Sequence, residues 1–308
     1  MEILLAKPRG FCAGVKRAIA VVNQALEKYG APVYVLHEIV HNTHVVGTLA
    51  DKGAVFVESL EDIPTGAITI FSAHGVAKAV EERAKALGLH TIDATCPLVS
   101  RVHRRVARLN KIDYDVLIIG HKNHPEVEGT YGRANGRVHI LSSEEDIHRL
   151  SIEDSSRVGY VTQTTLSMDD AGRLIDLLKE KYPEIDIPDR TDICYATQNR
   201  QTAVRELARE VDLFLVVGSK NSSNSNRLRE VADNGGVKAH LIDTADEIDP
   251  AWLEGVEKIG ITAGASAPEI LVEDVIAKLR KHGAASVREM EGTEEFTRFN
   301  LPPFPDFT

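Results

Sequence analysis

The sequence predicts an α/β fold with three small domains that have parallel sheets and are related by a pseudo-threefold axis. Short apolar runs are typical of buried strands, amphipathic segments between them are typical of helices, and this pattern occurs three times along the chain. Alternation of strand and helix indicates a parallel sheet, in which ligand groups collect at the carboxyl ends of the strands. The 308 residues are ample for a large buried core.

Each predicted domain contains a cysteine that opens a segment with helical spacing of apolar residues. These segments begin at Cys12 (FCAGVKRAIAVVNQAL), Cys96 (TCPLVSRVHRRVARL) and Cys194 (ICYATQNRQTAVRELA). Each is followed by an apolar run that predicts a buried strand, namely PVYVLHE, YDVLIIG and LFLVVGS. The three helix and strand pairs are therefore expected to be equivalent.

A polar turn follows each of these strands, and a second strand with a second polar turn occurs later in each repeat. The equivalent positions are His41, His124 and Ser222 in the first turns, and His74, Thr164 and Ser266 in the second turns. The intervals between the three cysteines match those between the first-turn residues to within one residue. Equivalent residues of three domains around one axis would meet at that axis, so the three cysteines are expected to converge.

The domain boundaries are predicted near the second and third cysteines. This places the first domain at 1–95, the second at 96–193 and the third at 194–282, with a strand within 1–12 that can complete the sheet of the third domain. From about Gly283 the chain leaves the repeat pattern. Residues 283–308 are expected to form a tail that lies over a surface or is frayed.

Composition and charge limit the function classes. The 43% hydrophobic and 27% charged residues are usual for a globular protein, and the net charge of -10 provides no sequence-wide basic field for nucleic acid or anionic lipid. The apolar start of the chain is too short for a secretory signal, and no apolar stretch is long enough to span a membrane. We expect a soluble, cytoplasmic protein without nucleic-acid or membrane partners.

The three cysteines fit neither a disulfide framework nor a CxxC pair, because they are odd in number and far apart. A single free cysteine is usually an inert small hydrophobe. A helix start, however, favours the thiolate, and three thiolates on one axis would form a soft metal site. A closed zinc site would have to recruit a histidine, whereas a 4Fe–4S cluster with three cysteine ligands leaves one iron open for chemistry. We favour the cluster.

The polar turns contain imidazoles, hydroxyls and amides without lysine or arginine at the expected ligand positions. These residues are His41, Asn42, His74, His124, Glu126, Gln163, Thr164, Thr165, Ser222, Ser223, Asn224 and Ser266. Such groups suit a phosphate or diphosphate, although serine and asparagine also serve as ordinary helix caps. Glu126, the only acid among them, is either a first-turn helix carboxylate or a proton donor. Neither GxGxxG nor GxxxxGK[ST] occurs, so electrons would have to come from outside.

Motifs spread over residues 3 to about 290 resemble one enzyme family. The segments GFCAGVKRAI, HEIVHN, SAHG, DATCPLV, GHKNHPEVEGT, TQTTLS, CYATQNRQ and GSKNSSNSNRL resemble the 4-hydroxy-3-methylbut-2-enyl diphosphate reductases, which catalyse the last step of the methylerythritol phosphate route to isoprenoids. The resemblance implies three domains around a central 4Fe–4S cluster. It also implies that Cys12, Cys96 and Cys194 are the ligands and that the open iron binds the hydroxyl oxygen of the substrate.

The resemblance also implies roles for the polar residues. Those for diphosphate binding are His41, His74, His124, Ser222, Ser223, Asn224 and Ser266. Glu126 and Thr164, with help from Gln163 and the neighbouring His124, would bring protons to the leaving hydroxyl. Reduced ferredoxin or flavodoxin would supply two electrons singly, and isopentenyl or dimethylallyl diphosphate would be released.

Two other functions stay open at the level of the sequence. A dehydratase of the quinolinate synthase type also has three pseudo-equivalent domains and a three-cysteine cluster with an open iron, but it needs no external electrons. A non-enzymatic redox or oxygen sensor would show no turnover and would need an interaction surface, of which the sequence gives no clear sign. Dependence of turnover on a reductant separates the two enzymes.

Overall fold

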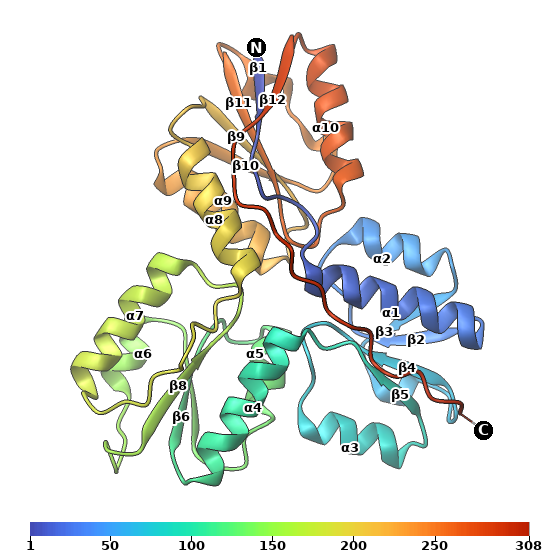
Figure 1. The fold of residues 1–308 in the computed structure, drawn as a ribbon, viewed down its shortest axis with the longest axis vertical. Helices are drawn as coiled ribbons and strands as arrows, with labels where there is room; N and C mark the ends of the chain where they lie inside the picture. Colours follow the sequence, from blue (N-terminus) through green and yellow to red (C-terminus); the bar gives the residue numbers. More distant parts are fainter. Residues whose placement is uncertain (308) are drawn as a thin grey trace. The chain divides into compact units, whose positions relative to one another are not determined.

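The computed structural model describes residues 1–307 and contains three sheets, in which all the strand pairs between 1 and 307 are parallel (Figure 1). The α/β class with parallel sheets, predicted from the sequence, is confirmed. The predicted pseudo-threefold arrangement stays a prediction. Between residues 1 and 307, no helix is both long and apolar enough to cross a membrane.

The first sheet has four strands in the order β3-β2-β4-β5. They are β2 (Val33–Leu36), β3 (Ala54–Val57), β4 (Ile68–Phe71) and β5 (His90–Asp93), and the helices along this part of the chain are α1 (Ala13–Tyr29), α2 (Thr43–Ala50), η1 (Leu60–Asp62) and α3 (Lys78–Ala86). Leu36 and Phe71 pack with Ala84 of α3 and with Leu89 in a core on one face of the sheet. The apolar run PVYVLHE thus supplies the interior strand β2, and the buried strand that the sequence predicts there is confirmed.

The second sheet has three strands in the order β7-β6-β8. They are β6 (Asp115–Ile119), β7 (Val138–Leu141) and β8 (Val158–Thr162), and the helices are α4 (Pro97–Lys111), α5 (Pro125–Tyr131), α6 (Glu144–Arg149) and α7 (Met168–Lys181). Both β6 and β8 are buried along their whole length. Leu117 and Ile119 belong to one core and Val116 and Ile118 to another, because successive strand residues point to opposite faces.

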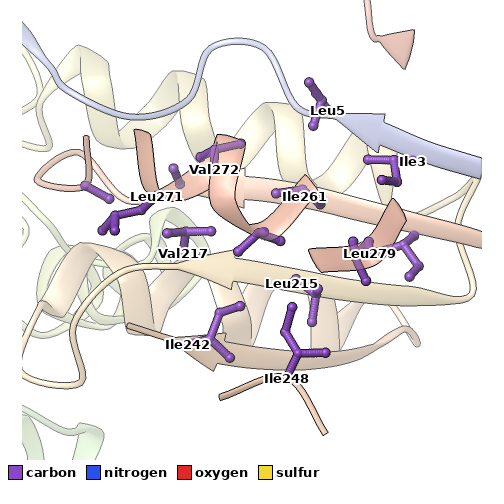
Figure 2. Packing of buried hydrophobic residues seen from close by; sticks show 14 of the residues in the cluster. Ile3, Leu5, Leu215, Val217, Ile242, Ile248, Ile261, Leu271, Val272 and Leu279 are labelled. Carbon is purple, nitrogen blue, oxygen red and sulfur yellow. The ribbon is translucent and has the colours of Figure 1, made fainter. Parts of the chain in front are cut away.

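The third sheet has five strands in the order β10-β9-β11-β1-β12. They are β1 (Glu2–Leu5), β9 (Leu213–Val217), β10 (Lys238–Ile242), β11 (Lys258–Ala263) and β12 (Ser286–Glu289), and the helices are α8 (Tyr195–Leu207), α9 (Ser223–Asn234), η2 (Ala245–Glu247), η3 (Pro250–Leu253) and α10 (Glu269–Lys281). Figure 2 shows Leu215 and Ile261 of the sheet packed near Leu279 of α10. Burial of each such side chain contributes roughly 1.5–3 kcal/mol.

The N-terminal strand β1 lies between β11 and β12 in this sheet (Figure 1). The sequence assigned 283–308 to a tail, but Ser286–Glu289 in that segment forms β12. Its residues are mostly exposed and polar, so they lack the apolar pattern by which the other strands are predicted. Pairing with β1 supplies the backbone hydrogen bonds that hold β12 in place.

Contacts between Cα atoms divide the chain into two compact units. The first unit contains 1–16, 41–47 and 195–298, and the second contains 17–40, 48–194 and the segment from 299 onward. The three domains predicted at 1–95, 96–193 and 194–282 stay a prediction. Candidate residues of the first unit are Cys12, His41, Asn42, Ser222, Ser223, Asn224 and Ser266, and those of the second are His74, Cys96, His124, Glu126, Gln163, Thr164, Thr165 and Cys194.

Candidate functional site

The first polar turns follow the interior strands β2, β6 and β9 at one fixed interval. In the strand pairing, Val35 is opposite Ile70, Ile118 is opposite Val161, and Val216 is opposite Thr262. His41, His124 and Ser222 follow Val35, Ile118 and Val216 by the same number of residues. The register of the sheets agrees with their predicted equivalence, which stays a prediction.

The same type of backbone hydrogen bond fixes the position of each of the three cysteines. The N–H groups of the cysteines donate to carbonyl oxygens in the second polar turns, from Cys12 to Ala265 (3.1 Å), from Cys96 to Ala73 (3.0 Å) and from Cys194 to Thr164 (3.0 Å). Each cysteine is thus attached to the carboxyl end of β11, β4 or β8 by the same contact.

This contact corrects the predicted register of the second turns by one residue. The residues that follow the three acceptor carbonyls are His74, Thr165 and Ser266, so Thr165 and not Thr164 is the equivalent of the other two. The strand pairing gives the same result. The sequence TQTT has two adjacent threonines, and spacing alone did not distinguish them.

None of the three cysteines forms a disulfide within residues 1–307, and all three are partly buried. Cys96 is the N-cap residue of α4, Cys194 directly precedes α8, and the Sγ atom of Cys12 accepts the N–H of Val15 at the start of α1 (3.5 Å). The N-terminus of a helix stabilises negative charge, so these positions suit sulfur ligands. In residues 1–307, no three histidine, cysteine, aspartate or glutamate side chains are grouped around a site for one metal ion. A 4Fe–4S cluster would not require such a group, because each cysteine would bind a different iron.

The second unit brings His74 and His124 together in an edge-to-face contact, with ring centroids 6.0 Å apart. This contact depends on the close approach of α5 to the turn that ends at Gly75. A Cβ atom on Gly129 of α5 would lie 2.9 Å from the carbonyl oxygen of Gly75, which has a φ of +75°. Glycine at both positions therefore allows the two imidazoles to meet.

His124 is the N-cap residue of α5, and Pro125 follows it at the first helical position. The Nδ1 atom of His124 accepts the N–H of Glu126 at 3.1 Å. Because Nδ1 is the acceptor, a neutral His124 carries its proton on Nε2. The local fold thus fixes His124 in the tautomer that donates from Nε2.

Glu126 has a buried carboxyl group that is bound by Thr164. Its Oε1 atom accepts the backbone N–H of Thr164 (2.6 Å), and its Oε2 atom accepts the hydroxyl of the same residue (3.0 Å). Burial raises the pKa of Glu126 to about 7, against the lowering effect of the two hydrogen bonds, and the negative charge of Asp192 raises it further. A carboxyl group with this pKa can hold and release a proton near neutral pH.

Gln163 connects two turns of the second unit. Its Oε1 atom accepts the N–H of His121 (3.0 Å), and its Nε2 atom donates to the hydroxyl of Thr165 (2.9 Å). The side chain is only 2% exposed. These bonds favour a role in positioning the two turns.

In the first unit, the turn at His41 is attached to two serines. Ser266 donates its hydroxyl to the carbonyl of His41 (2.8 Å), and the N–H of Thr43 donates to the hydroxyl of Ser219 (3.1 Å). The Oδ1 atom of Asn42 accepts the N–H of Val45, so Asn42 caps α2. These bonds bring His41, Asn42 and Ser266 together.

The start of α9 completes the polar set of the first unit. Ser222 is its N-cap, and the hydroxyl of Ser222 accepts the N–H of Ser225 (3.3 Å). Side chains at Gly218 or Gly264 would collide with the hydroxyl of Ser225, so glycine lets α9 approach the ends of β9 and β11. Ser223 is the first helical residue of α9.

Asn224 has a nearly buried side chain, and neither its Oδ1 nor its Nδ2 atom has a hydrogen-bond partner in residues 1–307. An amide buried without partners costs free energy. A ligand that both accepts and donates hydrogen bonds, or a ligand with water around it, would remove this cost. The side chain of Asn224 is therefore a direct indication of a binding site for a polar ligand.

Comparisons with known proteins give a consistent result. A family model described as LytB protein matches residues 3–280. The chain is 58% identical to a 4-hydroxy-3-methylbut-2-enyl diphosphate reductase of Bordetella pertussis, over 98% of this chain and 93% of the relative. It is 55% identical to a reductase of the same name from Psychrobacter arcticus, over 98% and 96% of the two chains.

Solved structures are similar as well. The structure of the E-1-hydroxy-2-methyl-but-2-enyl-4-diphosphate reductase from Plasmodium falciparum has a TM-score of 0.95 and 41% identity, and the match covers 98% of this chain and 95% of that one. A structure described as (E)-4-hydroxy-3-methyl-but-2-enyl diphosphate reductase, the terminal enzyme of the non-mevalonate pathway, has a TM-score of 0.65 and 36% identity, covering 91% and 99%.

Proposed function

The chain belongs to the LytB protein family, and we propose that it reduces (E)-4-hydroxy-3-methylbut-2-enyl diphosphate to isopentenyl and dimethylallyl diphosphate. It is an oxidoreductase of the non-mevalonate isoprenoid pathway, as its close relatives are. The observation that carries the mechanism is the repeated N–H to carbonyl bond that places Cys12, Cys96 and Cys194 equivalently on three strand ends.

The three cysteines are proposed to hold a 4Fe–4S cluster. The donor set supports this assignment, because the three cysteines form no disulfide within residues 1–307, are partly buried and are located at helix starts. When bound, the cluster supplies electrons and a Lewis-acidic iron for the hydroxyl oxygen of the substrate.

The diphosphate is proposed to bind to neutral donors of the polar turns. They are His41, His74, His124, Ser222, Ser223, Asn224 and Ser266. The fixed Nε2–H tautomer of His124 and the unpartnered amide of Asn224 support this role. Backbone N–H groups at the start of α9 can add hydrogen bonds to the anion.

Glu126 is proposed to be the proton donor to the leaving hydroxyl. Its carboxyl group has a pKa of about 7, so a large fraction is protonated at neutral pH. Thr164 orients the carboxyl group through two hydrogen bonds and can pass on its own hydroxyl proton. His124, which caps the helix of Glu126, and Gln163, which positions Thr165, complete this proton-handling group.

The proposed electron donor is reduced ferredoxin or flavodoxin, and the proposed compartment is the cytoplasm. Three cysteines that form no disulfide within residues 1–307 fit a reducing compartment.

The function is tested with anaerobically reconstituted protein and (E)-4-hydroxy-3-methylbut-2-enyl diphosphate, assayed with and without dithionite. We expect isopentenyl and dimethylallyl diphosphate to form only when the reductant is present. Turnover without reductant would support the dehydratase, and no turnover under either condition would support the sensor. A Mössbauer spectrum of iron-57-labelled protein is the second measurement, in which one iron of four should shift when substrate is added.

A further inference from the structure

The second unit has an open basic groove of about 330 Å³. Arg101, Arg105, Arg108 and Arg190 line it, together with a proline and two aspartates. The whole chain has a net charge of -10, so a concentration of arginines is a local departure from its acidic surface. None of these arginines belongs to the polar turns described above.

The helix α4 builds one wall of this groove. Arg101, Arg105 and Arg108 are spaced so that they lie on one side of the helix. The sequence of α4, PLVSRVHRRVARLNK, contains no acidic residue, and Arg104 and Lys111 are also exposed on it. The basic face runs for about 10 Å from Arg101 to Arg108 at 1.5 Å per residue, which is longer than one phosphate group requires.

The segment 186–192 builds the other wall and is attached to α4 by two of the arginines. Arg101 donates to the carbonyl of Thr191 (2.6 Å), and Arg105 donates to the carbonyl of Tyr160 and to the carboxylate of Asp186. Arg101 and Arg105 are thus structural. Arg108 and Arg190 are different, because both are exposed and neither forms an ion pair or hydrogen bond within residues 1–307.

Both walls lead directly to cysteines that are proposed to hold the cluster. Cys96 is the N-cap of α4, and Arg101 is five residues further on, or about 7.5 Å along the helix axis. On the other wall, Cys194 follows Asp192 by two residues. An electron that arrives at this groove is therefore close to two ligands of the cluster.

We propose that this groove, with the exposed Ile187 beside it, is the docking surface for a small acidic one-electron carrier protein. The inference rests on the proposed function, since it concerns the external source of electrons. Arginine next to an exposed apolar side chain is typical of a protein interface, and Ile187 is 51% exposed. Unpaired arginines attract an acidic partner and speed its association, and redox encounters commonly use small interfaces.

The test is the double variant Arg108→Glu/Arg190→Glu in the reconstituted full chain. Turnover is measured with reduced flavodoxin as the acidic carrier and, separately, with dithionite. We expect kcat/KM for flavodoxin to fall about tenfold or more and its dependence on salt to become weaker, while the rate with dithionite is unchanged. The double variant Arg280→Glu/Lys281→Glu on α10 carries the same charge change outside the groove and should behave as the parent protein does.

Unchanged kcat/KM for flavodoxin in the groove variant would overturn the docking surface. An equal loss of kcat/KM for flavodoxin in the α10 variant would also overturn it, because the effect would then come from the net charge of the protein. Inorganic phosphate could instead inhibit turnover equally with flavodoxin and with dithionite. If the only change in the groove variant is the loss of this inhibition, the groove is a small-anion site and the docking surface is overturned. Arg108→Gln/Arg190→Gln serves as a milder second variant. Failure of the parent protein to turn over with dithionite would instead contradict the proposed function.

Discussion

Arg200 and Glu295 form a buried ion pair, with 3.0 Å between Nη1 and Oε1 and side chains that are 1% and 14% exposed. The same guanidinium donates from Nε and Nη2 to the carbonyl of Gly10, at 3.1 and 2.7 Å. Gly10 is two residues before Cys12 and has a φ of +66°. The segment after β12 therefore helps to hold the loop that carries one predicted cluster ligand.

We expect Glu295→Ala to destabilise the protein by about 3 kcal/mol, because it leaves the buried charge of Arg200 without its carboxylate. The loop at Gly10 should loosen as well, so the iron content after reconstitution should decrease. Urea unfolding and iron analysis measure the two effects. The adjacent Glu294→Ala removes a partner of Lys7 from an exposed position, and its effect should be much smaller because solvent screens this pair. Equal effects of the two variants would contradict the role of the buried pair.

Glu126→Gln should be folded and should retain its cluster, but kcat should fall by about 10²–10⁴-fold, which is the usual contribution of a general acid. Glutamine can still accept the N–H of Thr164 and cannot supply the proton. Glu128→Gln on the same helix is the control, since Glu128 is exposed. Full activity of Glu126→Gln in the dithionite assay would remove this residue from the mechanism.

The pKa of Glu126 also predicts how stability depends on pH. Burial raises the pKa from 4.5 to about 7, so between these values the folded state binds more protons than the unfolded state. Stability should therefore fall as pH rises from 4.5 to 7 and level off above 7, with a loss of about 3 kcal/mol from this group. Glu126→Gln should remove this part of the loss, so urea midpoints at pH 5 and pH 8 should differ less than in the parent protein. An unchanged difference would contradict the raised pKa.

The elements that the sequence predicts best are those with one strong local signal. Strands β6 and β9 are continuous apolar runs because both of their faces are buried, and the equal spacing of His41, His124 and Ser222 follows from their repeated strands. The strand β12 was missed because pairing with β1, almost the whole chain away, stabilises it rather than its own polar sequence.

The site residues also divide into those with a local signal in the sequence and those that depend on contacts between distant segments. Equivalence of Cys12, Cys96 and Cys194 is visible in the sequence because each opens a helix. Thr165 was missed as the equivalent of His74, since it is distinguished from its neighbour only by the strand pairing and by the hydrogen bond from Cys194 to the carbonyl of Thr164. No local pattern could predict the pairing of Arg200 with Glu295, because it joins residues that are distant in the sequence.

The contact between His74 and His124 can be tested through the glycine that permits it. Gly129→Ala would place a Cβ atom 2.9 Å from the carbonyl oxygen of Gly75, so α5 must move away from the turn. We expect a destabilisation of about 1–3 kcal/mol and a higher KM for the diphosphate substrate, because the two imidazoles separate. Gly172→Ala in α7 meets no atom within 4 Å and should stabilise the protein by about 0.4–1 kcal/mol. Urea unfolding and steady-state kinetics of both variants provide the comparison, and an unchanged KM for Gly129→Ala would show that substrate binding does not need this contact.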